Sequence, residues 1–409
     1  MIKEKKGYYL FIVIIYFFVF RDYLERVVPL LGYVDELIAA MAIPILLIRI
    51  MSWKNGNVIS HLSFWKYILI TTACGIISTV LYHYQPLKAV LPDMLLCLKF
   101  WLTIEVGRYV FRNLDIKKKA NNLFMHIRFL TWFFTILVAI DYIHPIFNAT
   151  TRYGMRSEQL FYTHPSEFAS VMILLLAIIL MISNSIPKNK VILYSVLISL
   201  LVMTSMRSKI LGSIVAYWLI FYFAYYKKKR LGLKSLLMFV PLIVFIGWDQ
   251  IDYYFLSDVH QGSARYQLLA KSLEIANDHF PIGSGFGTYG SYYSSVYYSP
   301  LYSNYGISTI IGLRDGAASF VSDSFWPMII GQFGYLGLTG VVLALFELFK
   351  SIQKVRPNNL SMNVTGLFIL SYLLIESTAA SSFVHPYAMP FAMLIGYELC
   401  YIPQNSVRP

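Results

Sequence analysis

Hydrophobic segments long enough to cross a bilayer recur along most of the chain and are separated by polar connections. A hydrocarbon core of about 30 Å takes roughly 20 helical residues. With that ruler the pattern predicts transmembrane helices near residues 8–20, 27–48, 65–82, 87–107, 123–143, 166–183, 191–206, 210–226, 235–248, 324–349, 361–380 and 386–403. The sequence therefore predicts an all-α polytopic membrane protein with about 12 transmembrane helices.

One polar, tyrosine-rich stretch, residues 249–323, interrupts this pattern between the ninth and tenth predicted helices. Connections of this length are usually functional or disordered. Its glycines, aromatics and short helical pattern indicate an ordered segment with short helices. We therefore divide the chain into residues 1–248 (helices 1–9), 249–323 (a large loop and half of an active site) and 324–409 (helices 10–12).

Composition and charge agree with a membrane protein and set its orientation. Only 13% of the residues are charged, about half of the share in soluble domains. A net charge of +13 would suggest nucleic acid in a soluble protein, but its distribution matters more here. Alternate connections carry 22 Lys and Arg on one side and 10 on the other. The positive-inside rule then predicts cytoplasmic termini and an extracytoplasmic large loop, with lipid and no nucleic acid as a partner.

Four segments carry the candidate chemistry. Residues 151–169 enter the sixth predicted helix, 203–209 close the seventh, 265–289 form the centre of the loop, and 322–337 start the tenth helix. Their candidate binding residues are Arg152, Arg156, His164, Glu167, Arg207, Arg265, Gly285 and Tyr289. The positive-inside rule disfavours arginine in extracytoplasmic connections. Several arginines in separate extracytoplasmic connections therefore indicate a shared anionic ligand, because the guanidinium group suits phosphate oxygens. The alternative is that some are interface anchors.

Asp323 is one of four side chains that could act as a general base. A carboxylate within hydrogen-bond reach can take a proton from an attacking hydroxyl, but an aspartate at a helix start is also a common N-cap. Its rivals are Glu167, His164 and His385. A carboxylate entering a membrane helix, as Glu167 does, is costly unless it is functional or paired, and pairing with Arg156 or Arg207 is the plain explanation. His164 and His385 both precede prolines and also suit structural turns.

The loop is rich in tyrosine and glycine. Ten tyrosines between residues 249 and 323 suit sugar faces and, equally, a membrane-interface belt. Tyr289 to Tyr305 are therefore the candidates for contacts with a sugar ligand. Glycines 283, 285 and 287 allow a tight turn with close backbone approach.

These segments, in this order across residues 150–345, resemble the bacterial O-antigen polymerase and O-antigen ligase superfamily. The resemblance implies a GT-C-like, metal-independent glycosyltransferase of the bacterial inner (plasma) membrane, without a cofactor. Its donor and acceptor would be undecaprenyl-diphosphate-linked oligosaccharides, and a chain-length regulator and a flippase are candidate partners. Arg207 and Arg265 match the arginines thought to hold the pyrophosphate. Asp323 stands where ligases carry a histidine, which favours a polymerase.

The chemistry of the candidate residues is consistent with a glycosyltransferase. Breaking a sugar–pyrophosphate bond develops negative charge on the leaving diphosphate, which Arg207 and Arg265 would stabilise as catalytic groups. No Asp-x-Asp motif for a metal is found in the sequence. The alternatives are a ligase that transfers finished polymer to a lipid core and, from another class, a flippase for lipid-linked oligosaccharide. A flippase would need charges deep in its helices and has no use for so long an external loop.

Overall fold

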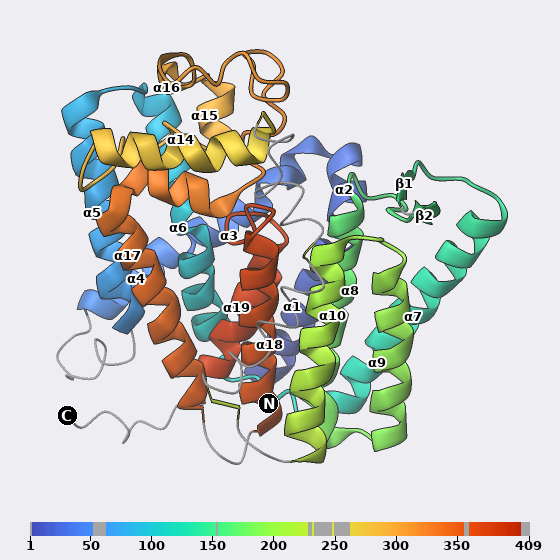
Figure 1. Cartoon of the computed structure of the whole chain (residues 1–409). Coiled ribbons are helices and arrows are strands. Elements are labelled where there is room, and N and C mark those ends of the chain that lie inside the picture. The colour runs from blue at the N-terminus through green and yellow to red at the C-terminus, as the bar shows by residue number, and fades with distance from the viewer. Residues whose placement is uncertain are drawn as a thin grey trace.

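A computed structural model describes residues 2–51, 63–152, 154–227, 231–232, 248, 262–355 and 360–401. This part of the chain is helical apart from one small hairpin (Figure 1). The first half contains α1 (Ile2–Val19), α2 (Arg21–Val27), a 3-10 turn (Pro29–Tyr33), α3 (Val34–Ala40), α4 (Ala42–Met51), α5 (Ser63–Tyr82), α6 (Leu87–Val110) and α7 (Ala120–Ile143). Strands β1 (Thr150–Arg152) and β2 (Met155–Ser157) then pair in antiparallel fashion.

The second half begins with α8 (Pro165–Ile182), a 3-10 turn (Ser183–Ser185), α9 (Lys188–Met203), α10 (Ser208–Phe221) and a π-helical turn (Tyr222–Tyr226). The loop contains α14 (Ala264–Asp278), α15 (Tyr292–Val296) and α16 (Pro300–Asn304), followed by α17 (Phe325–Gln353), α18 (Leu360–Ser377) and α19 (Ala388–Leu399). The predicted ninth span, 235–248, lies outside the described residues except for Trp248.

The structure is that of a helical membrane protein. Among the described residues six helices are long and apolar enough to cross a bilayer, and the bent pair Lys6–Val19 and Arg21–Val27 makes a seventh if it counts as one span. The predicted second span corresponds to Pro29–Leu47, one of the six, which comprises the 3-10 turn, α3 and the first part of α4, while α18 and α19 are shorter apolar helices. Because α8 is apolar on every side, it is buried along nearly its whole length, as expected for the central helix of a bundle.

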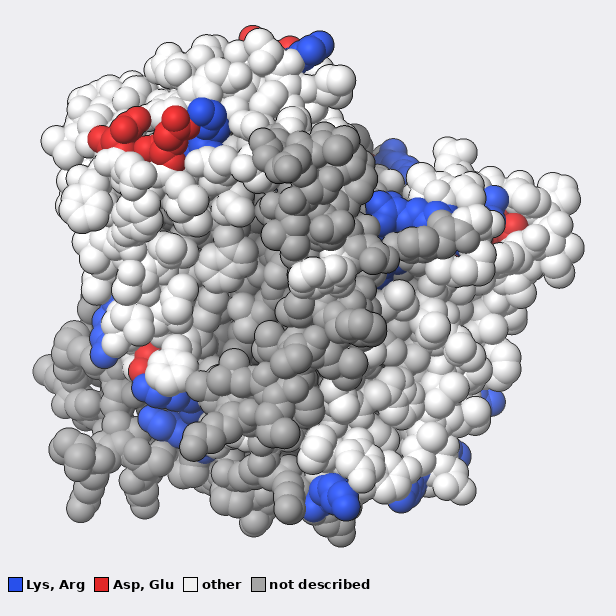
Figure 2. Space-filling view, in the orientation of Figure 1, with Lys and Arg blue, Asp and Glu red and all other residues white. Residues whose placement is uncertain are grey.

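The bundle has two distinct ends. At one end Phe11 of α1 packs on Phe111, and Tyr397 of α19 accepts a hydrogen bond from the Ile116 amide, so the first and last described helices meet the α6–α7 connection there. The opposite end, which we call the outer end, carries α14, α15, α16 and the β1–β2 hairpin (Figure 1). In the space-filling view most visible charges lie toward these two ends, with few between them (Figure 2).

The loop is anchored in the bundle through a break in α17. Gly334 has non-helical angles (φ 62°, ψ −165°) inside this helix, and the loop segment 281–285 fits against the break. The Ser284 and Gly285 amides donate to the carbonyls of Gly331 and Gln332 at 3.0 and 2.9 Å. In return the Pro281 carbonyl accepts from the Leu336 amide at 3.1 Å. Main-chain groups released by the break are thus satisfied by the loop, as the membrane environment requires.

The described part of the loop has its own hydrophobic core. Its fully buried members come from α14, α16 and the segments around them: Leu268, Ile275, Tyr289, Leu301, Tyr302, Ile307, Leu313 and Val321. Ser263, Ser291 and Ser299 accept N-cap hydrogen bonds at the starts of α14, α15 and α16, as their side chains favour. An ordered segment with short helices was predicted here, and α14 is the longest of its three helices at 15 residues.

Candidate functional site

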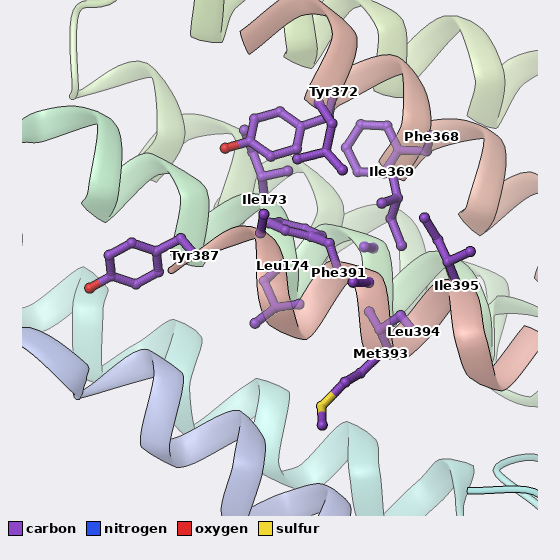
Figure 3. Packing of buried hydrophobic residues seen from close by; sticks show 14 of the residues in the cluster. Ile173, Leu174, Phe368, Ile369, Tyr372, Tyr387, Phe391, Met393, Leu394 and Ile395 are labelled. Carbon is purple, nitrogen blue, oxygen red and sulfur yellow. The ribbon is translucent and has the colours of Figure 1, made fainter. Parts of the chain in front are cut away.

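A cavity of about 450 Å³ opens at the outer end, between the loop and the bundle. It is lined by the starts of α8, α10, α14 and α19, by the end of α18 and by the segments that precede α17 and α19. Charged and hydroxyl side chains dominate the lining: His164, Ser166, Glu167, Ser170, Lys209, Arg265, Ser319, Ser322, Asp323, Tyr372, Glu376, Ser381, Ser382, His385 and Tyr387. Beneath it, the apolar side chains of α8, α18 and α19 pack together, and the hydroxyls of Tyr372 and Tyr387 point out of that cluster (Figure 3).

Arg265 and Asp323 face each other across one wall of the cavity. The Arg265 Nη2 to Asp323 Oδ2 distance is 3.6 Å, and the two side chains are 23% and 38% exposed. Although Asp323 keeps this access to solvent, the surrounding protein raises its pKa, and the charges of Arg265 and Lys209 only partly oppose that effect. The N-cap residue of α17 is Ser324, so the N-cap interpretation of Asp323 is wrong.

A second ion pair joins α10 to α18 at the same cavity. Lys209 Nζ lies 2.5 Å from Glu376 Oε1, and both side chains are largely buried. Lys209 also acts electrostatically on Asp323. The cavity wall therefore alternates in charge, from Arg265 to Asp323 to Lys209 to Glu376.

Glu167 caps its own helix. Its Oε2 accepts hydrogen bonds from the Thr163 amide (3.1 Å), the Thr163 hydroxyl (2.5 Å) and the His164 amide (3.0 Å), the last of which completes a capping box. Its Oε1 lies 3.7 Å from Nε2 of His385. Of the two partners considered for Glu167, Arg156 is engaged by Asp141 and Glu158 instead.

His164 is a neutral imidazole at the start of α8. Burial lowers its pKa to about 3, and the charges of Arg207, Lys209 and Arg152 add to this effect. Nδ1 accepts a hydrogen bond from the Ser166 amide at 3.1 Å, so the proton of the neutral ring resides on Nε2. Arg207 and Arg152 act electrostatically on His164, but neither side chain lines the cavity.

Asp22 braces the outer end from behind the cavity. Its carboxylate accepts hydrogen bonds from the Tyr387 hydroxyl at 2.7 Å and from the Thr163 amide at 3.2 Å. It thereby ties α2 to the segments that begin α8 and α19, and it is itself only 4% exposed.

Three of the predicted binding residues are engaged in structural contacts away from the cavity instead. Arg156 pairs with Asp141 and with Glu158 (2.6 Å), and it donates to the Phe147 carbonyl at 2.7 Å. Those bonds hold the β1–β2 hairpin on α7. They use donors of the Arg156 guanidinium, so that group does not serve the cavity.

Tyr289 and Gly285 belong to the junction between loop and bundle. The Tyr289 side chain is fully buried in the loop core and its hydroxyl donates to the Leu268 carbonyl at 2.8 Å. A Cβ on Gly285 would lie 2.7 Å from Oγ1 of Thr79, because this backbone packs directly on α5. Neither residue reaches the cavity.

Sequence reasoning missed Lys209, Glu376, Asp22 and Ser166. The signal for Glu376 was a carboxylate near the end of an otherwise apolar segment, which is costly unless it is paired or functional. Within the described part of the chain, no three His, Cys, Asp or Glu side chains are grouped so as to hold a metal ion.

Comparison with known proteins does not assign the chain to a family. No family model matches the chain, and no curated protein gives a significant match. Fold and site together define a helical membrane protein with a charged, partly buried cavity at its outer end.

Proposed function

We propose that the chain is a membrane glycosyltransferase that polymerises undecaprenyl-diphosphate-linked oligosaccharide repeat units into a surface polysaccharide of the O-antigen or capsule type. The observation that carries the proposal is the cavity in which Arg265, Asp323 and Lys209 adjoin one another. Such a site offers cations for a diphosphate and a carboxylate for an acceptor hydroxyl within one enclosure.

The reaction is a single displacement at the anomeric carbon of the donor sugar. The acceptor hydroxyl attacks that carbon, the bond from carbon to the diphosphate oxygen breaks, and the electron pair leaves with the diphosphate. Arg265 and Arg207 stabilise the charge that develops there. Asp323 takes the hydroxyl proton, for which Glu167 is less suited because Oε2 already accepts three hydrogen bonds. The configuration at the anomeric carbon inverts.

In the bilayer we propose twelve spans in a GT-C-like arrangement, with both termini in the cytoplasm and the cavity facing outward in the bacterial inner (plasma) membrane. Helices occupy eleven of the twelve predicted ranges, the remaining range being the ninth, outside the described residues. The asymmetry of Lys and Arg supports the orientation. A substrate on the outer leaflet would reach the cavity after transfer by a flippase, and a chain-length regulator is a further candidate partner.

The test uses the purified full chain in lipid nanodiscs with the lipid-linked repeat unit extracted from the host's membranes. The wild-type protein is expected to convert it into a ladder of products. Arg207→Lys and Arg265→Lys are each expected to abolish the ladder at unchanged expression, because a point-charge ammonium does not reproduce the guanidinium fork. Asp323→Asn is expected to slow ladder formation by about a hundredfold or more, because an amide cannot take the hydroxyl proton. Arg314→Lys is the matched control, since Arg314 is an external arginine whose Nε donates to the Thr309 carbonyl within the loop.

Other products would identify the alternatives. A single transfer product that requires a lipid-core acceptor would indicate a ligase. Transport of the lipid-linked unit that continues in Asp323→Asn would indicate a flippase. A ladder retained in both arginine variants would end the proposal.

A further inference from the structure

Helices α8 and α18 run in opposite directions and are joined by one hydrogen bond near the cavity floor. The Ser170 and Tyr372 hydroxyls are 2.7 Å apart. Ser170 donates its own proton to the Ser166 carbonyl, so Tyr372 is the donor to Ser170. One helical turn further out, on both sides of the same seam, stand Ser166 on α8 and Glu376 on α18. Both side chains line the cavity.

Each of these two residues has a buried polar atom without a hydrogen-bond partner among the described residues: Oγ of Ser166 and Oε2 of Glu376. The residues are 8% and 5% exposed. Buried polar atoms are nearly always hydrogen-bonded, and leaving one unsatisfied is costly. Two such atoms on facing helices at one cavity indicate a ligand that both donates and accepts.

The hydroxyls next to Glu376 are already committed as donors. Each gives its proton to a main-chain carbonyl, in the pairs Ser377 to Leu374, Thr378 to Ile375, Ser381 to Ser322 and Ser382 to Leu373. The Tyr372 proton is committed to Ser170 as well. The donor for Oε2 of Glu376 must therefore come from outside this group.

The ion pair between Lys209 and Glu376 has an unfavourable orientation relative to the dipoles of its two helices. Lys209 lies in the first turn of α10 and Glu376 in the last turn of α18. A cation at a helix N-terminus and an anion at a C-terminus are each disfavoured. The pair is thus poorly explained by helix stability, whereas it fixes one oxygen of Glu376 on Lys209 and leaves the other for a ligand.

We propose that Glu376 and Ser166 form a subsite for a hydroxyl group of the glycan on the lipid-linked substrate. The sugar hydroxyl donates to Oε2 of Glu376 and accepts from Oγ of Ser166, which satisfies both atoms. A phosphate oxygen does not fit, because it offers no proton and Glu376 repels it. The subsite rests on the proposed function for the identity of its ligand, and it separates sugar recognition from the diphosphate contacts of Arg265.

The test measures the affinity of the full chain in nanodiscs for two probes: undecaprenyl diphosphate without sugar, and the same lipid carrying the host's repeat unit. Glu376→Gln is expected to weaken binding of the sugar-bearing lipid by about tenfold to a hundredfold, and Ser166→Ala by about two- to tenfold. Affinity for the bare lipid is expected to stay within about twofold in both. Arg265→Met is expected to weaken both probes. Glu274→Gln, which removes an exposed carboxylate on α14 paired with Lys271, is the matched control.

Glu376→Gln leaves Lys209 without its buried partner and can impair folding, so the double variant Lys209→Met/Glu376→Gln, which removes both charges, is measured beside it. The subsite is overturned if Ser166→Ala and the double variant keep the affinity for the sugar-bearing lipid, or if they weaken both probes equally. If the wild-type protein builds no ladder, but the variants lose affinity for the sugar-bearing lipid alone, the polymerase proposal falls and the subsite stands. If the ladder forms and the variants keep that affinity, the reverse holds.

Discussion

Two polar regions meet at the outer end and differ in what their polar groups contact. At the junction where residues 281–289 fit the break in α17, the loop is bonded to the bundle through its main chain, and Gly285 and Tyr289 are packed on protein atoms. At the cavity, charged side chains stand in alternating order and line an open space. The junction is filled by main-chain hydrogen bonds and packed rings, whereas the cavity leaves ionisable side chains accessible to a ligand.

This difference separates architecture from chemistry within a single loop. Glycine and tyrosine at the junction meet a steric demand, because backbone must pass close to helices and a ring must fill the loop core. Arginine, lysine and carboxylates at the cavity are costly to place there and gain little from packing. Substitutions in the two regions should therefore affect different observables, folding in one and turnover in the other.

The largest expected effect is at the junction. Gly283 has φ +75°, and a Cβ there would lie 2.4 Å from the Gly334 amide nitrogen. Gly283→Ala should cost about 3 kcal/mol or more, because backbone on both sides must shift. The measurement is the yield of monodisperse protein and its thermal midpoint in detergent.

Gly306→Ala is the control for that substitution. Gly306 has nearly the same φ, +71°, but nothing lies within 4 Å of its added Cβ. It should lose only about 1 kcal/mol from backbone strain. Equal stability of the two variants would contradict the close approach that defines the junction.

At the cavity, Asp323→Asn should lower the rate of ladder formation by about a hundredfold to ten-thousandfold, the usual contribution of a general base. Its thermal midpoint should stay unchanged or rise slightly, since burial already disfavours the charged carboxylate in the folded state. The initial rate and the midpoint are measured on the same preparation. A large drop in the midpoint with the activity retained would assign Asp323 to structure.

Much of the fold follows from the sequence, because apolar runs of bilayer length give helices at nearly every predicted range. The break in α17 does not, since nothing local marks Gly334 as the residue at which a distant loop inserts. The 75° bend between Lys6–Val19 and Arg21–Val27 was equally hidden, because hydropathy reports burial in lipid and not the path of the helix axis.

The candidate site could be predicted only in part. Arg265 was found because it is an arginine in an extracytoplasmic connection, and Asp323 because it stands where the resembled ligases carry a histidine. His164 and Glu167, also predicted, line the same cavity. Arg156 was grouped with Arg265 as an external arginine, although one of its neutralising partners, Glu158, lies two residues away in the same segment and the other is Asp141. Lys209 and Glu376 were passed over because pairing across two helices cannot be read from either segment alone.

Arg156 offers the next sharpest contrast with Arg265. Arg156→Gln leaves Asp141 and Glu158, both fully buried, without their cation, and should destabilise the protein by about 3 kcal/mol. Arg265→Gln, at a partly exposed pair, should cost less than about 1 kcal/mol while it abolishes the ladder. The thermal unfolding midpoints of the two variants test this difference in stability. If Arg156→Gln keeps wild-type stability but loses diphosphate binding, Arg156 belongs to the site after all.

The pH dependence of turnover should report the cavity alone. Because burial raises the pKa of Asp323, the fraction in the basic form falls as the pH drops, and turnover should decline at a higher pH than the ordinary aspartate pKa of about 3.9 would give. His164, with a pKa of about 3, should contribute nothing to this limb. Initial rates of ladder formation from neutral to acid pH, for wild type and His164→Gln, test both statements. A limb that moves in His164→Gln would show that the imidazole titrates instead.

The smallest expected effect returns to the junction and tests whether a predicted sugar-binding tyrosine is structural. Tyr289→Phe removes only the hydroxyl that donates to the Leu268 carbonyl and should lower stability by about 1 kcal/mol. The rate of ladder formation and the affinity for the sugar-bearing lipid should not change, because the ring is sealed within the loop core. Tyr292→Phe, at a tyrosine that is 56% exposed, should leave stability unaltered. If Tyr289→Phe instead weakens sugar binding at constant stability, the loop core must open during turnover, and the division between a closed junction and an open cavity would no longer hold.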